Sequence, residues 1–309
     1  MPPNATIGHL LPPATLASLA NLELVARVAV EGFLIGLHRS PRFGFSQEFK
    51  EYRAYVEGDD PRFVDWNVYA RTERTYIRRY EGETNTRLMI LLDASASMSY
   101  TSHSVSKLQY AKFLAAALSY LAMRQHDPAG LIVFDEQVRQ YRPPTARAGG
   151  LTGMMHTIDA VQASGGTRLL DCFAKFREHL TRRGLVAVIT DLYCDPAALT
   201  KAVQPLAYHG HDIVIFQLLD PNEKQPEVLT KVGVGKGRES LLLEDMETQA
   251  TVQVSAEYLR ERYTERLETH LGDLRRATAS VGAHHVAIVT DEPLDRALRQ
   301  YLKFREGRG

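Results

Sequence analysis

The stretch Leu88-Met-Ile-Leu-Leu-Asp-Ala-Ser-Ala-Ser-Met98 decides the fold that we expect. Its apolar run ends in an acid, and a serine stands at each of the next two alternate positions. A short apolar run with polar flanks predicts a strand that is buried on both faces of a sheet. Asp93, Ser95 and Ser97 then fall in the loop at the carboxyl end of that strand. In open α/β sheets, ligands bind at this end.

These three side chains allow two interpretations. Small oxygen-bearing side chains in one turn are the beginning of a site for a hard cation, since Mg²⁺ prefers oxygen ligands. Ser and Asp also gather before helices, where they satisfy the free amide groups of the first turn. On these residues alone, both interpretations stay open.

The rest of the chain alternates between strand and helix patterns. Buried strands are predicted at 88–93, 129–134, 185–191, 213–219 and 285–290, and an edge strand at 137–142 that ends in two prolines. Helices are predicted at about 104–125, 151–161, 169–183, 196–207, 256–281 and 293–305. This order predicts an α/β fold, a doubly wound and mostly parallel sheet with helices on both faces.

Two regions lie outside this alternation. Residues 1–84 are predicted to form an N-terminal extension, with helices between Pro13 and Leu37 and strands at 49–56 and 75–80. Residues 85–309 form the sheet domain, which carries a small β-hairpin insertion near 238–254. One hypothesis is that this hairpin pairs with the N-terminal strands in a small β subdomain.

The only tryptophan, Trp66, stands beside Asp65 in a segment rich in arginine. A tryptophan between charges of both signs favours a structural staple held by Arg–carboxylate pairs. The alternative is a partner-binding anchor, because Trp and Arg dominate binding hot spots.

Composition sets broad limits on the function. Of the 309 residues, 37 are Lys or Arg and 37 are Asp or Glu, so no basic field favours nucleic acid or membrane surfaces. No secretory signal pattern is expected at the N-terminus, and no apolar window approaches the roughly 20 residues that cross a bilayer. The two cysteines, Cys172 and Cys194, have no metal-type spacing and suit a reducing compartment. We therefore expect a cytoplasmic protein.

Two more polar residues join the first loop at the predicted sheet edge. Thr167 follows two glycines, which allow a close approach of the backbone, and Asp191 ends the most strand-like run of the chain. The set of five oxygen-bearing side chains comes from three loops: Asp93, Ser95, Ser97, Thr167 and Asp191. This joint pattern is more specific than any of its members.

The five residues resemble the metal-ion-dependent adhesion site (MIDAS) of von Willebrand factor type A domains. In that family an Asp-x-Ser-x-Ser loop, a threonine and a later aspartate hold Mg²⁺ or a similar cation such as Mn²⁺ or Ca²⁺. The resemblance implies that the serines and the threonine bind the cation directly, and that the aspartates often act through water.

A second resemblance covers residues 20–305. The N-terminal motif is similar to that of the bacterial domain-of-unknown-function-58 family, whose members carry a type A domain: Arg53-x-Tyr55-x-x-Gly58-Asp59-x-x-Arg62-x-x-Asp65-Trp66, then Ala70-Arg71-Thr72. Members of this family are commonly associated with MoxR-type AAA+ ATPases. The resemblance therefore implies an adaptor or chaperone-like partner of such an ATPase.

We expect binding rather than catalysis at this site. A cation held mainly by neutral hydroxyls keeps an open position that an acidic side chain of a partner protein can fill. The alternative is a magnesium-dependent phosphohydrolase, because acids at strand ends also serve phosphoryl transfer. The sequence favours it less, since the first loop holds one acid and no Lys or His flanks it as a general acid. The expected function is thus a non-enzymatic, metal-dependent protein-interaction module without nucleic acid as a partner.

Overall fold

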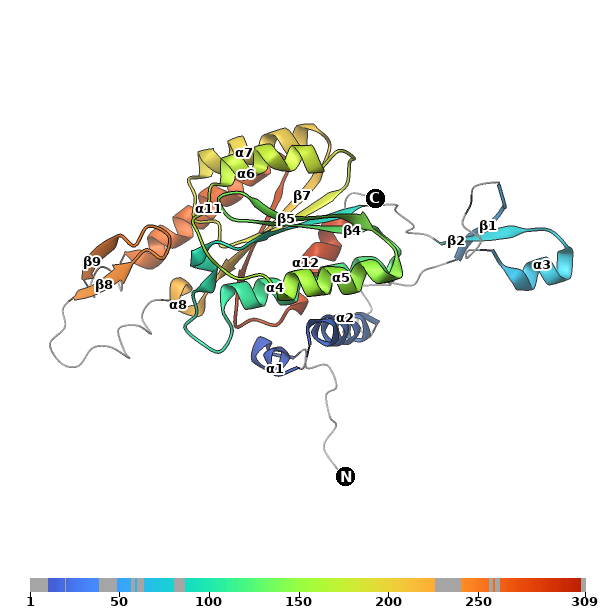
Figure 1. The fold of residues 1–309 in the computed structure, drawn as a ribbon, viewed down its shortest axis with the longest axis horizontal. Coiled ribbons are helices and arrows are strands. Elements are labelled where there is room, and N and C mark those ends of the chain that lie inside the picture. The colour runs from blue at the N-terminus through green and yellow to red at the C-terminus, as the bar shows by residue number, and fades with distance from the viewer. Residues whose placement is uncertain are drawn as a thin grey trace, which may run out of the picture.

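The computed structural model describes residues 11–19, 21–38, 49–56, 59, 64–80, 87–225, 240–255, 258 and 262–306. A six-stranded sheet forms its centre (Figure 1), in the spatial order β10-β7-β6-β3-β4-β5. The strands are β3 (Leu88–Asp93), β4 (Ala129–Phe134), β5 (Val138–Thr145), β6 (Leu185–Thr190), β7 (Asp212–Leu219) and β10 (His284–Val289). All neighbours pair in parallel except β4 and β5.

The strand sequences account for this order. Every residue of β3, β4 and β6 is buried, as expected of central parallel strands that are covered on both faces. β5 is largely exposed and contains Pro143 and Pro144, which cannot donate ladder hydrogen bonds and so belong on an edge strand. The prediction of a doubly wound, mostly parallel sheet is confirmed.

Helices cover both faces of the sheet. The helices of the first face are α4 (Lys107–Arg124), α5 (Ala148–Asp159) and α12 (Asp295–Glu306), and their side chains share one core with the sheet. The helices of the second face are α6 (Leu169–His179), α7 (Pro196–Tyr208) and α11 (Tyr263–Ser280), which contribute to a second core. No helix in the described ranges is long and apolar enough to cross a membrane.

The first two helices belong to the core of the sheet domain. α1 (Pro13–Ala17) and α2 (Leu22–His38) lie on the outside of α4, and α2 packs along it (Figure 1). Leu16, Val25 and Phe33 are buried there. Of the predicted extension, residues 1–84, only the elements after α2 can therefore lie outside the sheet domain. The domain boundary near residue 84 stays a prediction.

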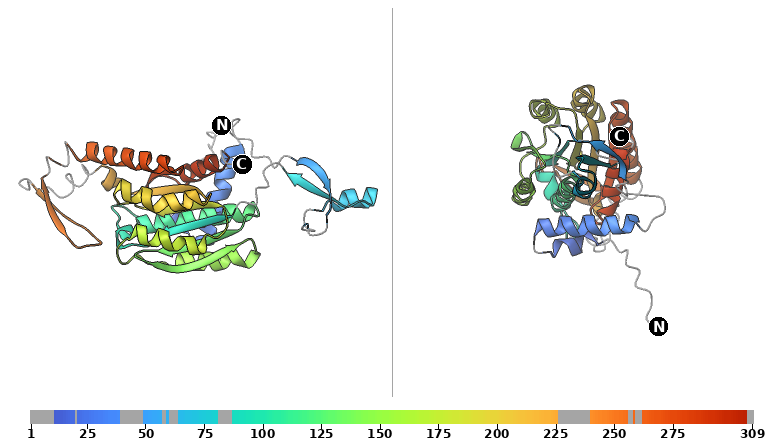
Figure 2. Two further views of the ribbon diagram at one scale, coloured as in Figure 1. Left: turned by 90° about the horizontal axis from the view of Figure 1, so that it is seen from above. Right: turned by 90° about the vertical axis from the view of Figure 1, so that its right-hand side faces the viewer.

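Two small antiparallel sheets stand apart from the central one. β1 (Phe49–Ala54) pairs with β2 (Tyr76–Tyr80), and β8 (Ser240–Glu244) pairs with β9 (Thr251–Ser255). They lie at opposite ends of the molecule (Figure 2) and form separate sheets. The predicted hairpin is confirmed, but the hypothesis that it pairs with the N-terminal strands is wrong. A hairpin closes on itself through local pairing, so it needs no other strand to satisfy its inner hydrogen bonds.

The segment around Trp66 forms the short helix α3 (Trp66–Thr72) beside β1 and β2. Asp65 is buried and caps α3 by accepting hydrogen bonds from the amides of Asn67 and Val68. The Trp66 residue is 62% exposed and its ring contacts Tyr69 edge to face. This exposure contradicts the interpretation of Trp66 as a structural staple. The acid of the pair, and not the tryptophan, is the buried residue.

Candidate functional site

The candidate site lies at the carboxyl edge of the sheet, where β3 and β6 are neighbours. Asp93 is the last residue of β3 and Asp191 directly follows β6. Parallel strands in register bring their carboxyl ends to one edge, so the two acids come together from positions almost a hundred residues apart.

Asp93 is fully buried at this edge. One carboxylate oxygen accepts a hydrogen bond from the Ser95 amide at 2.9 Å, and the other accepts from the Thr190 hydroxyl at 2.6 Å. Burial and the neighbouring charge of Asp191 raise the pKa of Asp93 to about 7, against the opposing effect of these hydrogen bonds. The strand ends thus hold two buried acids close enough to repel each other.

The two serines turn their hydroxyls toward each other in the short 3-10 helix Ala96–Ser99 and the residue before it. The oxygens of Ser95 and Ser97 lie 3.1 Å apart. Ser95 occupies the cap position of this helix but makes no side-chain capping bond, and the helix α4 is capped by Ser106 instead. The capping interpretation of the two serines is therefore wrong.

The Thr167 loop docks directly on the serine loop. The amide of Ala96 donates to the carbonyl of Gly165 at 2.8 Å, and the amide of Ser164 donates to the carbonyl of Ala94 at 2.9 Å. Gly165 has a φ of 75°, a backbone conformation that glycine adopts without strain. The glycine-rich loop thereby carries Thr167 to the edge where the serines and aspartates lie.

Sequence reasoning missed a sixth oxygen-bearing residue, Glu247, in the turn of the β8–β9 hairpin. One oxygen of its carboxylate accepts hydrogen bonds from the hydroxyls of Ser97 and Thr167, each at 3.0 Å. The other oxygen accepts from the Thr167 amide at 3.0 Å. Glu247 therefore joins two of the three loops. The sequence showed only that an acid lies at the turn of the predicted hairpin, and it did not indicate that this hairpin contacts the sheet edge.

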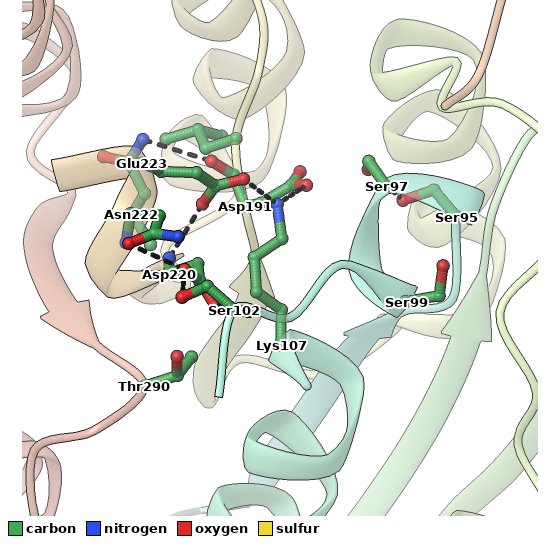
Figure 3. A network of polar contacts seen from close by, with 12 residues as sticks. Ser95, Ser97, Ser99, Ser102, Lys107, Asp191, Asp220, Asn222, Glu223 and Thr290 are labelled. Atoms are coloured by element: carbon green, nitrogen blue, oxygen red, sulfur yellow. Dashed lines mark hydrogen bonds and ion pairs between the residues drawn. The ribbon is translucent and has the colours of Figure 1, made fainter. Parts of the chain in front are cut away.

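Lys107, at the start of α4, was also missed. Its ammonium group lies 2.8 Å from Asp191 and 2.7 Å from Glu223, and the lysine is fully buried. Figure 3 shows this side chain extending from the helix to Asp191. Burial alone would lower the pKa of Lys107, but the two carboxylates outweigh that effect and raise it. Lys107 comes from the helix that follows the serine loop, and its ion pairs are with Asp191 and Glu223 rather than with Asp93, the acid of the first loop.

Two further contacts hold Asp191 and its surroundings in place. The buried Gln217 of β7 donates from its side-chain amide to the carbonyl of Asp191 at 3.1 Å, and it is bonded in turn by His285 of β10 at 2.8 Å. Asp220, at the end of β7, accepts from the amide and hydroxyl of Ser102, which fixes the loop before α4 (Figure 3). These bonds link the residue after β6 to β7 and β10, and the end of β7 to the loop before α4.

The donor set fits a divalent cation. The side chains at the edge offer carboxylate and hydroxyl oxygens, which are the ligands of Mg²⁺, Mn²⁺ and Ca²⁺. Lys107 pairs with the carboxylates of Asp191 and Glu223, whereas those of Asp93 and Glu247 accept hydrogen bonds from hydroxyl and amide groups. Burial and the charge of Asp191 raise the pKa of Asp93, and a bound cation would offset the repulsion between these two acids.

Comparison with known proteins gives relatives over nearly the whole chain. Uncharacterized proteins of Mycobacterium bovis and Mycobacterium tuberculosis are 26% identical over 294 residues, covering 94% of this chain and 89% of theirs. Among solved structures, the conserved hypothetical protein BatB from Bacteroides thetaiotaomicron covers 72% of this chain and 99% of its own, at 16% identity and a TM-score of 0.45. The SpRpn10 VWA domain covers 70% of this chain and 94% of its own, at 13% identity and a TM-score of 0.38.

A family model matches most of the chain. The family described as "Protein of unknown function DUF58" matches residues 51–272, which include most of β1, the five candidate residues and the hairpin with Glu247. That range is more than two thirds of the sequence, and the chain therefore belongs to the DUF58 family.

Proposed function

We propose that this protein is a non-enzymatic interaction module in which a divalent cation receives an acidic side chain of a partner protein. The cation is Mg²⁺, or Mn²⁺ or Ca²⁺ in its place. The residues that would hold it are Asp93, Ser95, Ser97, Thr167 and Asp191. When bound, the cation would supply a positive charge with a position open to a further oxygen ligand.

One observation carries this proposal. The hydroxyls of Ser97 and Thr167 already receive a carboxylate, that of Glu247, at 3.0 Å. A site that orients two hydroxyls and an amide around one carboxylate is complementary to acidic side chains. Hydrogen bonds to a charged acceptor are about twice as strong as neutral ones, which favours an acid over an amide ligand.

The partner that we propose is a MoxR-type AAA+ ATPase or its client, and the compartment is the cytoplasm. The support for this partner is the family membership, since the family resemblance implies such an association. The absence of a basic field in the composition agrees with a protein partner rather than nucleic acid.

A pull-down with the cognate ATPase tests the proposal. We expect capture in Mg²⁺, loss of capture in EDTA, and loss with Asp93→Ala. The matched control is Asp159→Ala, which removes an exposed acid at the end of α5 that is not one of the five candidate residues. Equal capture in all four arms contradicts a metal-dependent interaction.

Lys107 gives one reason to retain phosphohydrolase activity as a second candidate, because it places a cationic group beside Asp191. Its raised pKa and its two ion pairs oppose a role as a proton donor, since a lysine held in this way keeps its proton. Incubation of the purified protein with Mg²⁺ and a panel of phosphoesters separates the two functions. Sustained turnover by the wild type that is abolished in Asp93→Asn would contradict the binding function and support catalysis.

A further inference from the structure

We propose that Glu247 is the chain's own ligand for the candidate cation site, and that it occupies the position that a partner's acidic side chain would take. This inference rests on the proposed function, because it assigns a role to Glu247 only if a cation binds at the sheet edge. It adds a sixth residue to the site, and it implies that a partner's acidic side chain must compete with Glu247 for the cation.

The contacts of Glu247 coincide with the residues expected to bind the cation. Its carboxylate accepts from the hydroxyls of Ser97 and Thr167 and from the Thr167 amide. A hydroxyl donates one proton and keeps two lone pairs, so both hydroxyl oxygens can bond Glu247 and still face a cation. The carboxylate therefore lies beside the ligands without blocking them.

The hairpin turn is built to present this side chain. Asp245 accepts hydrogen bonds from the amides of Glu247 and Thr248, at 2.8 and 3.0 Å. The turn is closed by a bond from the Asp245 amide to the Ala250 carbonyl at 2.8 Å. Local bonds of this kind fix the direction in which the middle residue points. These bonds hold the backbone at Glu247 from within the hairpin itself.

Burial distinguishes Glu247 from its neighbours in the turn. Asp245, Met246 and Thr248 are exposed, with Met246 at 42%, whereas Glu247 is half-buried. Within the described residues, the hydrogen bonds that join this turn to the sheet domain all end on the Glu247 carboxylate. The turn lies beside the sheet domain in both Figure 1 and Figure 2.

Charge explains why an outside acid would compete with Glu247 rather than bind with it. The edge already holds the carboxylates of Asp93 and Asp191, which repel each other, and Lys107 is shared between Asp191 and Glu223. A further carboxylate at hydrogen-bond distance of the same hydroxyls would be repelled at short range. The partner's acid must therefore displace Glu247.

Two binding measurements on the full chain test this assignment, using Glu247→Gln and the matched control Glu244→Gln. Glu244 is an exposed acid of the same hairpin. Calorimetric titration with Mg²⁺ reports cation affinity, and fluorescence anisotropy of a labelled hexaglutamate peptide in saturating Mg²⁺ reports affinity for an outside acid.

We expect the two affinities of Glu247→Gln to change in opposite directions. The loss of a ligand weakens Mg²⁺ binding by about 10- to 100-fold, in the range found for residues that support metal ligands. The loss of the internal competitor strengthens peptide binding by about tenfold or more. A purely structural role of Glu247 would lower both affinities. Glu244→Gln leaves both at the wild-type level.

The outcomes separate this inference from the proposed function. If the wild-type protein binds no Mg²⁺, the proposed function fails. If it binds Mg²⁺ and Glu247→Gln leaves both affinities unchanged or lowers both, only the assignment of Glu247 is overturned.

A measurement on the wild type covers the case in which Glu247→Gln does not fold. Mn²⁺ should broaden the amide resonance of Thr248 together with that of Ser97. A Thr248 signal that stays sharp while Ser97 broadens overturns the assignment.

Discussion

The ammonium group of Lys107 lies 2.8 Å from the carboxylate of Asp191, and the two side chains are 1% and 3% exposed. Lys107 follows the serine loop in the chain and begins α4. One continuous segment thus supplies both the two serines and the Lys107 ammonium group that pairs with Asp191 after β6. The lysine neutralises part of the charge at the sheet edge and keeps Asp191 in a fixed position.

Replacing Lys107 with Met tests this role. The substitution leaves Asp191 and Glu223 without their shared cation, and breaking a buried pair from one side costs about 3–5 kcal/mol. We expect a loss of that size in the free energy of unfolding, measured in urea. Lys112→Met is the control, because Lys112 is only half-buried and bonds a single backbone carbonyl. A loss below about 1 kcal/mol for Lys107→Met contradicts the role of the pair.

Cation binding should appear as thermal stabilisation. A ligand that binds only the folded state adds about 2.7 kcal/mol at a hundred times its Kd. We expect Mg²⁺ to raise the Tm of the wild type and EDTA to reverse the rise. Asp93→Asn removes a carboxylate and should abolish the response while it keeps an acceptor for the Ser95 amide. A full Mg²⁺ response in Asp93→Asn would place the cation elsewhere.

His285 predicts one part of the pH dependence of stability. Burial, with the charges of Arg275, His284 and His270, lowers the pKa of His285 to about 4. The unfolded value is about 6.5, so between these values the unfolded state binds more protons. The free energy of unfolding should rise as the pH increases from about 4 to 6.5. This contribution of His285 should be lost as the pH falls through the same window. Unfolding at a series of pH values should give a shallower slope for His285→Gln, and equal slopes would refute this contribution.

The exposed ring of Trp66 makes a prediction about the β1–β2 segment. Trp66→Ala should change local stability by less than about 1 kcal/mol, as for most surface substitutions. Ile77→Ala, at a buried position of β2, should cost about 2–5 kcal/mol. Hydrogen exchange of the amides that pair β1 with β2 measures both. A large loss of protection in Trp66→Ala would restore the tryptophan as a structural residue.

The sheet and its edge could be predicted from the sequence because the signals are local. Apolar runs that end in an acid mark β3 and β6, and parallel pairing brings their ends together. The Thr167 loop could be placed for the same reason, since it follows a strand–helix unit of ordinary length. Most strand and helix bounds agree to within a few residues, which reflects the gradual ends of such elements. The start of α11 is an exception, because this helix begins at Tyr263 and was predicted from residue 256.

Glu247 and Lys107 could not be predicted, for different reasons. The hairpin that carries Glu247 forms by local pairing, and local pairing does not determine where an insertion docks. Lys107 stands at the start of an amphipathic helix, where a lysine is ordinarily exposed, and fully buried lysines are rare without partners. Its partners, Asp191 and Glu223, follow 84 and 116 residues later in the chain. Contacts of that range depend on the finished fold.

The covalent attachment of the β8–β9 hairpin has a consequence for how the site would respond to a partner. A tethered ligand acts at an effective concentration, which is about millimolar for short connections and does not fall when the protein is diluted. A partner with one weakly bound acid would then compete poorly at micromolar concentration. A partner that presents several acids at once, or that also holds the hairpin away, would compete well. The hairpin would in this way restrict binding at the sheet edge to partners whose combined contacts are strong enough to displace Glu247.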